Sequence, residues 1–311
     1  MSVGTREALA RVRARLTTEA FHEVRTSPPP RLYHYTRLST LQHILEGRKV
    51  WATEGHFLND TTELRHAASL ILDFVSARLT SEVIDKHKTE NVLTFIEHLF
   101  RKDAEDHDRL IFVSSFSEHS DSLSQWRAYA DDGAGVALGL DLNYLLAKDY
   151  EDLAPFLTRP AVLKCEYEHA KQCRILESIV RGLTEKALEL SSAKGGAHWS
   201  AVAMELAYQI LLVANDFGPL LKNPGFAEEA EWRILVRDEG ISISEAVKFR
   251  DTKFGPAPYI EVPLTAGQLL PLTHVVFGPR VEHAAKRSVR LMLSRYGLDP
   301  ELTNATATYR S

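Results

Sequence analysis

Four groups of polar side chains in this sequence have residue types that can bind or cleave a polar ligand. The first is the run Arg31-Leu-Tyr-His-Tyr-Thr36, which has the composition of a short strand. Because side chains alternate along a strand, His34 and Thr36 share one face while Tyr33 and Tyr35 share the other. A histidine and a hydroxyl on one face can hydrogen-bond a polar ligand at a sheet edge. An ordinary, partly buried strand explains the same run.

The second group, Asn59 and Asp60, comes shortly before a series of apolar residues at helical spacing. Asp60 and Glu63 have the spacing of a capping box, which predicts a helix start at this point. The polar side chains also suit a ligand cleft. Helix capping accounts for them equally well, so both interpretations stay open.

The third group combines serines at the end of a predicted strand with a short helix that follows it. The run 110–116 is continuous and apolar, which is typical of a buried strand, and Ser115 and Ser117 lie at its end. The helix at 122–129 carries three side chains of interest: Trp126, Arg127 and Tyr129. The serines either bind a ligand or hydrogen-bond the neighbouring backbone. The rings of Trp126 and Tyr129 either cover a bound ligand or belong to the hydrophobic core.

The fourth group is a cluster of carboxylates, Glu228, Glu229 and Glu231, at the start of a predicted strand. Period-two alternation puts Glu229, Glu231 and Arg233 on one strand face. Repulsion among the carboxylates must be relieved by Arg233, by solvent or by a cationic ligand. Acidic side chains at a strand end facing a cleft are plausible catalysts, so Glu231 is our candidate catalytic residue.

The composition of the chain excludes several functional classes. Its 311 residues carry a formal net charge of -5, which gives no overall attraction to nucleic acid. Two cysteines, Cys165 and Cys173, supply neither a disulfide framework nor a four-cysteine zinc site, so a cytoplasmic location is expected. The thirteen histidines lack zinc-ligand spacing, and no bound metal is expected.

No membrane segment is expected from the hydropathy of the chain. The most apolar stretch, 201–214, contains Glu205 and Gln209 and is shorter than a bilayer requires, which indicates a buried helix. The N-terminal segment mixes arginines with glutamates and has no apolar core of the signal-peptide kind.

Hydrophobic periodicity predicts a mixture of strands and helices. Strands are predicted at 31–36, 50–52, 110–116, 136–140, 162–167, 232–236, 259–262 and 274–277. Helices are predicted at 1–25, between 38 and 47, after 60, at 82–100, at 122–129, within 169–221 and at 280–296. Because these elements do not alternate regularly, the predicted fold class is α+β.

The predicted domain organisation is one large domain with an N-terminal extension. Residues 1–30 form an amphipathic helix and a proline-rich connector, since three consecutive prolines at Pro28 to Pro30 cannot continue a helix. Residues 31–311 form a single α+β domain with a helical insertion at about 169–221.

These clusters, in this order, resemble the bacterial family known as domain of unknown function 2971. The resemblance spans about residues 31–310, nearly the whole chain. Its matching segments are Leu32-Tyr-His-Tyr-Thr36, Leu45-Glu-Gly47, Leu58-Asn-Asp60 with Glu63, Phe116-Ser117, Ser124-Gln-Trp-Arg127, Gly135-Val-Ala-Leu-Gly139, Glu231-Trp-Arg233 and Val276-Phe-Gly-Pro279.

That family in turn resembles ADP-ribosyltransferases, whose NAD site combines a first-strand His-x-Thr, a second-strand serine element and a third-strand glutamate. His34 with Thr36 matches the first element as in DarT-like toxins, and Ser115 with Ser117 matches the second. Glu229-Ala-Glu231 has the Glu-x-Glu spacing of the third. The serine element departs from the usual Ser-Thr-Ser form. The resemblance implies a split β-sheet core with helical insertions.

The resemblance also implies roles for the site residues. Glu231 would stabilise the positive charge that develops on ribose when nicotinamide leaves, and Glu229 would orient or deprotonate the acceptor. His34 would bind a ribose hydroxyl, supported by Thr36 and Ser115. An aromatic ring from Tyr35, Trp126 or Tyr129 would stack on nicotinamide, and Arg127 or Arg233 would neutralise the pyrophosphate.

The expected activity is transfer of ADP-ribose from NAD to a macromolecular acceptor, nucleic acid or protein, in a defence or toxin context with a regulatory partner. Two alternatives stay open. An NAD glycohydrolase would use water as the acceptor, and a nucleotide-binding or interaction module would perform no chemistry. Under the enzymatic hypotheses, His34, Ser115 and Glu231 are expected to meet at one cleft.

Overall fold

The computed structural model describes residues 3–24, 26–58, 62–81, 90–99, 110–146, 161–192, 198–237, 246–252, 255–265 and 269–307. The chain divides into two compact units. Unit 1 comprises Met1–Arg25, Asn59–Arg109 and Glu166–Gly225, and unit 2 comprises Thr26–Leu58, Leu110–Cys165 and Phe226–Ser311.

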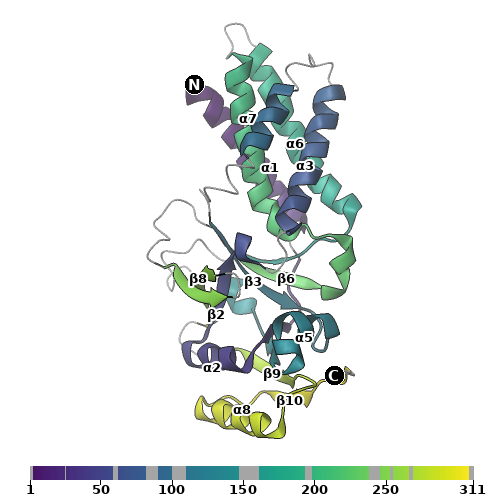
Figure 1. The fold of residues 1–311 in the computed structure, drawn as a ribbon. Helices are drawn as coiled ribbons and strands as arrows, with labels where there is room; N and C mark the ends of the chain where they lie inside the picture. Colours follow the sequence, from purple (N-terminus) through teal and green to yellow (C-terminus); the bar gives the residue numbers. More distant parts are fainter. Residues whose placement is uncertain are drawn as a thin grey trace. The chain divides into compact units, whose positions relative to one another are not determined.

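Unit 1 is helical, and Figure 1 labels the long helices of its described part. They are α1 (Val3–Val24), α3 (Thr62–Ser81), α6 (His169–Ser192) and α7 (Trp199–Phe217), and the 3₁₀ helix η5 (Gly218–Leu220) follows α7. Helix α7 is apolar on nearly all sides and its side chains are mostly buried, as expected for a helix surrounded by others. The predicted helical insertion therefore packs with α1 and α3 around a core of its own.

Buried and partly buried polar side chains of unit 1 form hydrogen bonds with one another and with the backbone. The Gln172 side chain, with no exposed surface, donates to the backbone carbonyls of Glu166 and Lys222, each at 2.7 Å. Arg13 donates to Gln209 at 2.9 Å and forms an ion pair with Asp216 at 2.9 Å. These bonds compensate the cost of removing the polar groups from water.

Unit 2 contains the β-sheet. Its strands are β1 (Leu32–Thr36), β2 (Lys49–Glu54), β3 (Ile111–Ser117), β4 (Val136–Leu140), β5 (Ala161–Lys164), β6 (Glu231–Arg237), β7 (Lys248–Thr252), β8 (Gly255–Pro263), β9 (Leu272–Phe277) and β10 (Glu301–Asn304). Its α-helices are α2 (Leu38–Gly47), α5 (Leu123–Tyr129) and α8 (His283–Arg295). The described residues also form short 3₁₀ helices: η1 (Gly55–Phe57), η2 (Asp131–Gly133), η3 (Asn143–Leu146) and η6 (Pro224–Glu229).

The strand order is β10-β9-β4-β1-β3-β2-β8-β7, and β6 pairs with both β3 and β5. The pairs are antiparallel except for β10 with β9. Helices and a largely antiparallel sheet therefore coexist without regular alternation, which confirms the α+β class.

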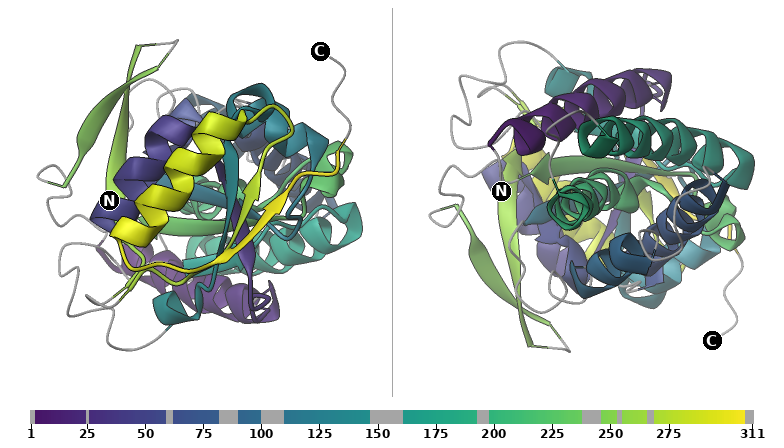
Figure 2. Two further views of the ribbon diagram at one scale, coloured as in Figure 1. Left: turned by 90° about the horizontal axis from the view of Figure 1, so that it is seen from below. Right: turned by 90° about the horizontal axis from the view of Figure 1, so that it is seen from above.

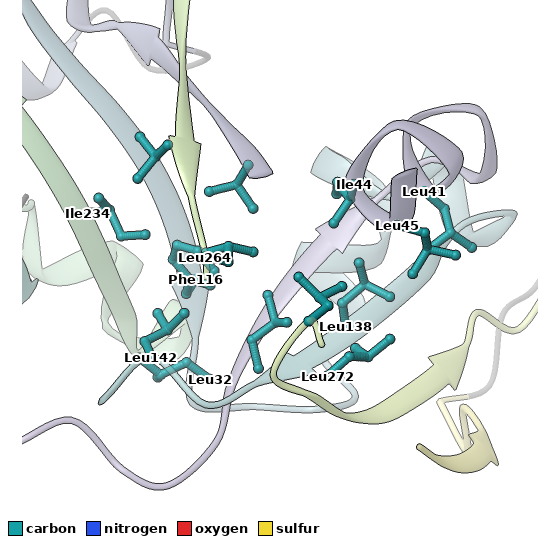
Figure 3. Packing of buried hydrophobic residues seen from close by; sticks show 14 of the residues in the cluster. Leu32, Leu41, Ile44, Leu45, Phe116, Leu138, Leu142, Ile234, Leu264 and Leu272 are labelled. Atoms are coloured by element: carbon teal, nitrogen blue, oxygen red, sulfur yellow. The ribbon is translucent and has the colours of Figure 1, made fainter. Parts of the chain in front are cut away.

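The larger core of unit 2 lies between strand faces and helices α2 and α8, which run side by side in Figures 1 and 2. Figure 3 shows part of it, where Leu41, Ile44 and Leu45 of α2 approach Leu138 of β4. A smaller cluster gathers Tyr33, Tyr35, Trp126 and their neighbours on the other face of β1. Packing on both faces fixes β1, which carries the first group of candidate site residues.

The predicted elements differ from the observed ones mainly at two strands. Strands β7 and β10 were absent from the prediction, since their sequences, Lys-Phe-Arg-Asp-Thr and Glu-Leu-Thr-Asn, are short and polar. Figure 2 shows the β7–β8 hairpin, in light green, projecting from the edge of the sheet. None of the helices in the described ranges is long and apolar enough to cross a membrane.

Candidate functional site

Three segments that are distant in sequence form one row across adjacent strands of unit 2. Tyr33 of β1 pairs with Ser117 of β3, and Ser117 pairs with Glu231 of β6. The strands that carry the histidine, serine and glutamate groups are therefore neighbours in the sheet, and we call Tyr33, Ser117 and Glu231 the cross-strand row.

Strand β3 is only partly paired on the side that faces β1 and β2. Strand β1 pairs with it at Tyr33↔Ser117, and β2 pairs with it at Thr53↔Val113 and Glu54↔Phe112. Between these contacts, none of the residues that the structure describes pairs as a strand partner with 114–116 on that side. We call this segment the β3 opening. Backbone groups there are free to bond side chains or a ligand.

His34 occupies the β3 opening. Its Nδ1 lies 3.0 Å from the carbonyl oxygen of Ser115, and its ring lies 5.3 Å from the ring of Phe116. Burial lowers the pKa of His34, the Ser115 carbonyl opposes this change, and the charge of Arg250 lowers the pKa further. The ring is therefore neutral at pH 7. Because a carbonyl can only accept, Nδ1 carries the proton and Nε2 is left as an acceptor.

The serines of β3 have different surroundings. Ser117 is buried, and its hydroxyl donates to the carbonyl of Glu229 at 2.7 Å and accepts from the His119 amide at 3.1 Å. Ser115 is partly exposed and pairs with Arg233 of β6. Ser117 therefore ties β3 to the start of β6, whereas the Ser115 side chain has surface that a ligand can reach.

The turn Glu229-Ala230-Glu231 is strained. Ala230 has φ of 42°, in the left-handed region that a residue with a Cβ rarely adopts. The Ala230 carbonyl accepts from the Glu118 amide at 3.1 Å, which helps to hold this conformation. Such strain costs on the order of 1–3 kcal/mol and is found most often at functional sites.

Glu231 and Arg233 form a bidentate ion pair on one face of β6. Arg233 Nε lies 2.8 Å from Glu231 Oε1, and Arg233 Nη2 lies 3.1 Å from Oε2. Both side chains are at least 95% buried. The sequence offered Arg233, solvent or a cationic ligand as ways to relieve repulsion between the carboxylates, and in the structure Arg233 pairs with Glu231. The predicted pyrophosphate role of Arg233 needs correction, because its guanidinium is already engaged and buried.

The expectation that His34, Ser115 and Glu231 meet at one cleft is wrong for His34. Ser115 and Glu231 share a face of the sheet, and His34 does not. Direct partners in a sheet point to the same side, so Tyr33, Ser117, Glu231 and Arg233 lie on one face and His34 belongs to the other. His34 is connected to the strand that carries Ser117 by its hydrogen bond to the Ser115 carbonyl in the β3 opening. A ligand that contacts both groups must therefore pass along the partly paired edge of β3.

Several predicted ligand-binding residues are instead part of the protein interior. Trp126 has no exposed surface, and its Nε1 donates to Asp121 at 2.7 Å, so its ring cannot stack on nicotinamide. Tyr35 is buried against Trp126, donates to the carbonyl of His119 and accepts from the Ser122 amide. Burial raises the pKa of Tyr35. Thr36 is also buried.

The remaining predicted residues fall into three groups. Tyr129 is partly exposed and Arg127 is exposed, both on α5. Glu229 is 9% exposed at the end of η6. Asn59 and Asp60 lie outside the described residues.

Two charged residues near the row were not singled out from the sequence. Glu118 follows Ser117 and accepts from Lys164 Nζ at 2.7 Å and Trp232 Nε1 at 2.8 Å. Burial alone would raise the pKa of Glu118, but these hydrogen bonds outweigh it and lower the pKa. The second is Arg250 of β7, whose charge acts on His34. Within the described ranges, no group of three or more His, Cys, Asp or Glu side chains is arranged to hold a metal ion.

Comparison with known proteins gives one match. Residues 125–234 match the family described as Protein of unknown function (DUF2971), a segment that includes most of α5, all of β4 and the Glu229-Ala230-Glu231 turn. This match confirms the resemblance to that family. No curated protein and no solved structure matches the chain.

Proposed function

We propose that this chain, in which residues 125–234 match the DUF2971 family, is an ADP-ribosyltransferase-like enzyme that cleaves NAD and transfers ADP-ribose to a macromolecular acceptor. The observation that carries the proposal is the cross-strand row. Tyr33, Ser117 and Glu231 are far apart in sequence, yet they pair in series on β1, β3 and β6. The order of these strands suits an enzyme whose site is assembled from three separate motifs.

The β3 opening supports a ligand site of this kind. A neutral His34 with a free Nε2 can accept a hydrogen bond from a ribose hydroxyl, since Nδ1 is already committed to the Ser115 carbonyl. His34 is fixed in this orientation before any ligand arrives. Preorganisation of this sort lowers the entropic cost of binding.

The proposed reaction breaks the bond between the nicotinamide nitrogen and C1′ of ribose. The bonding electron pair leaves with nicotinamide, and positive charge develops on the ribosyl centre. Glu231 would stabilise that charge, with Arg233 fixing the orientation of its carboxylate. A nucleophile on the acceptor then bonds to C1′ and loses its proton to Glu229 or to water.

One observation favours the alternative of a module that performs no chemistry. Both oxygens of Glu231 accept hydrogen bonds from Arg233, so part of its negative charge is compensated before a ribosyl cation forms. In that case the pair would only stabilise the start of β6. The second alternative, an NAD glycohydrolase, uses the same site with water as the nucleophile.

The experiment uses NAD that is labelled on its adenylate half. The full-length protein is incubated with this NAD and with separate protein and nucleic-acid fractions from bacterial cells, and nicotinamide release is followed in parallel. A transferase releases nicotinamide and puts label on one fraction. Free labelled ADP-ribose with no labelled macromolecule identifies a glycohydrolase, and no nicotinamide release with any fraction identifies a module.

The biological context of the proposal is a cytoplasmic defence or toxin effector held in check by a regulatory partner. This part rests on analogy with DarT-like toxins alone. Identification of the labelled component would test it further, because a toxin of this type would modify a component that the cell needs for growth.

A further inference from the structure

Arg250 of β7 is a partly buried cation without a carboxylate partner in the described part of the chain. Its Nη2 donates to the Thr53 hydroxyl at 2.7 Å, and its Cζ lies 5.6 Å from the centre of the Trp51 ring. Its Nε is buried, with no hydrogen-bond partner among the described residues. A buried guanidinium hydrogen atom without an acceptor is costly, and an anionic ligand would remove that cost.

The charges around Arg250 also favour an anion. Burial lowers the pKa of Arg250, and the charge of Arg37 lowers it further against an opposing effect of Tyr259. Thr53, to which Arg250 donates, pairs with Val113 of β3, the residue directly before the β3 opening, so the guanidinium lies beside the proposed NAD site. The charge of Arg250 also acts on His34 in that opening. Two cations near one another attract a phosphate more strongly than either does alone.

Neighbouring side chains hold Arg250 in a defined position. The Trp51 ring lies beside Tyr259, with ring centres 4.9 Å apart, and beside His43 at 5.6 Å. A guanidinium against an aromatic face keeps its planar edge available for hydrogen bonds. Thr53 restrains a second atom of the group. The guanidinium therefore has restricted freedom before a ligand binds.

We propose that Arg250 binds a phosphate group of the ligand that occupies the β3 opening, with Thr53 and Trp51 as positioning residues. The inference rests on the proposed function and specifies it: the ligand is a nucleotide with a pyrophosphate, and its phosphate is recognised from the β7–β8 hairpin. This assignment replaces Arg233, which Glu231 already engages.

The test is calorimetric titration of the full-length protein with ADP-ribose, inorganic pyrophosphate and adenosine. Three proteins are compared: the parent, Arg250→Gln and Lys248→Gln. Lys248 is a matched control because it lies on the same strand and already pairs with Glu261 at 2.9 Å. Arg250→Gln is expected to raise the Kd of ADP-ribose and pyrophosphate about 10- to 100-fold and to leave adenosine binding unchanged. Lys248→Gln should bind all three like the parent.

Equal affinity of the parent and Arg250→Gln for ADP-ribose would overturn the phosphate assignment while leaving NAD cleavage intact as a separate question. Absence of nicotinamide release in the parent, with Arg250-dependent binding of ADP-ribose, would instead overturn the enzymatic proposal alone. If Arg250→Gln does not fold, Thr53→Val keeps the charge and removes one restraint. It should then weaken ADP-ribose binding by a few fold, and unchanged binding would contradict the inference.

Discussion

Units 1 and 2 differ in whether their buried and partly buried polar groups have hydrogen-bond partners. In unit 1, Gln172 donates to two backbone carbonyls, and Arg13 is shared between Gln209 and Asp216. In unit 2, two buried polar atoms lack a hydrogen-bond partner among the described residues, Ser114 Oγ and Arg250 Nε. Ser114 is part of the β3 opening, and Arg250 acts electrostatically on the histidine that occupies it.

Under the proposed function, the difference indicates which unit would bind the ligand. In a folded protein, nearly all buried polar groups have a hydrogen-bond partner. Buried groups without a protein partner are therefore expected where a ligand supplies the missing hydrogen bond. Unit 2 also contains the strained turn at Ala230 and the partly paired edge of β3. Among the described residues, unit 1 has no buried side-chain atom of this unpartnered kind. Substitutions in the two units should therefore separate stability from ligand binding.

The largest effect on stability is expected from Gln172→Leu in unit 1. The substitution leaves the carbonyls of Glu166 and Lys222 without their side-chain donor in a buried position. Chemical denaturation should show a loss of about 2–5 kcal/mol in the free energy of unfolding. The same replacement at exposed Gln42 is the control and should change stability by less than about 0.5 kcal/mol. Equal stability of parent and Gln172→Leu would contradict the proposed contrast between the units.

A smaller effect, on binding rather than stability, is expected from His34→Ala in unit 2. Loss of the Nε2 acceptor should weaken NAD binding by roughly 1–3 kcal/mol, measured by calorimetric titration. His283→Ala, at an exposed position on α8, is the control with the same chemical change. If both variants bind NAD as the parent does, His34 does not contact the ligand.

The pH dependence of stability should report on the same histidine. The folded-state pKa of His34 lies below its ordinary value of 6.5, so the unfolded chain binds the proton more tightly. Its contribution to stability is complete above pH 6.5 and is lost as the pH falls from 6.5 through the folded-state pKa. His274 behaves in the same way, because burial also lowers its pKa.

Melting temperatures at pH 7.5 and pH 5.5 measure this loss. His34→Gln and His274→Gln should each lose less stability on acidification than the parent, and the double variant should lose least. The effect is limited to at most about 1.4 kcal/mol per pH unit for each histidine. An unchanged pH dependence in His34→Gln would show that the pKa of His34 is the same in the folded and unfolded chain.

The smallest effects distinguish two serines on the same strand. Ser117→Ala removes the donor to the Glu229 carbonyl and should cost about 1–2 kcal/mol in the free energy of unfolding. Ser114→Ala removes a hydroxyl that has no partner among the described residues, so stability should stay within about 0.5 kcal/mol. Denaturant titration compares the two directly. A larger loss for Ser114→Ala than for Ser117→Ala would reverse the interpretation.

The sequence predicts strands and helices well where the hydrophobic pattern is strong. Strand β4 has the predicted bounds, α1 and α5 differ by one or two residues at their ends, and α7 is the predicted buried helix. These segments bury most of their side chains, so the period of their apolar residues reflects the burial directly. Strand β7 has no such pattern, because its side chains are mostly exposed. Arg250 was missed for this reason.

The candidate site could be predicted in part. The sequence places Glu231 and Arg233 on one strand face and offers Arg233 as a partner for the carboxylates, which the bidentate pair confirms for Glu231. Glu229 was predicted on the same strand face, which is wrong, because it ends η6 and is separated from β6 by the left-handed Ala230. Strand neighbours cannot be derived from one sequence, because they depend on long-range pairing. The row from Tyr33 to Glu231 and the burial of Trp126 therefore came only from the structure.

Nicotinamide release by Glu231→Gln tests the central claim most directly. The substitution keeps the shape of the side chain and removes its charge, so turnover should fall by about two to four orders of magnitude while NAD affinity stays near that of the parent. Glu228→Gln, at the exposed neighbouring carboxylate, is the control and should retain parental turnover. Parental turnover in Glu231→Gln would contradict the account, since the charge at the start of β6 would then play no part in the reaction.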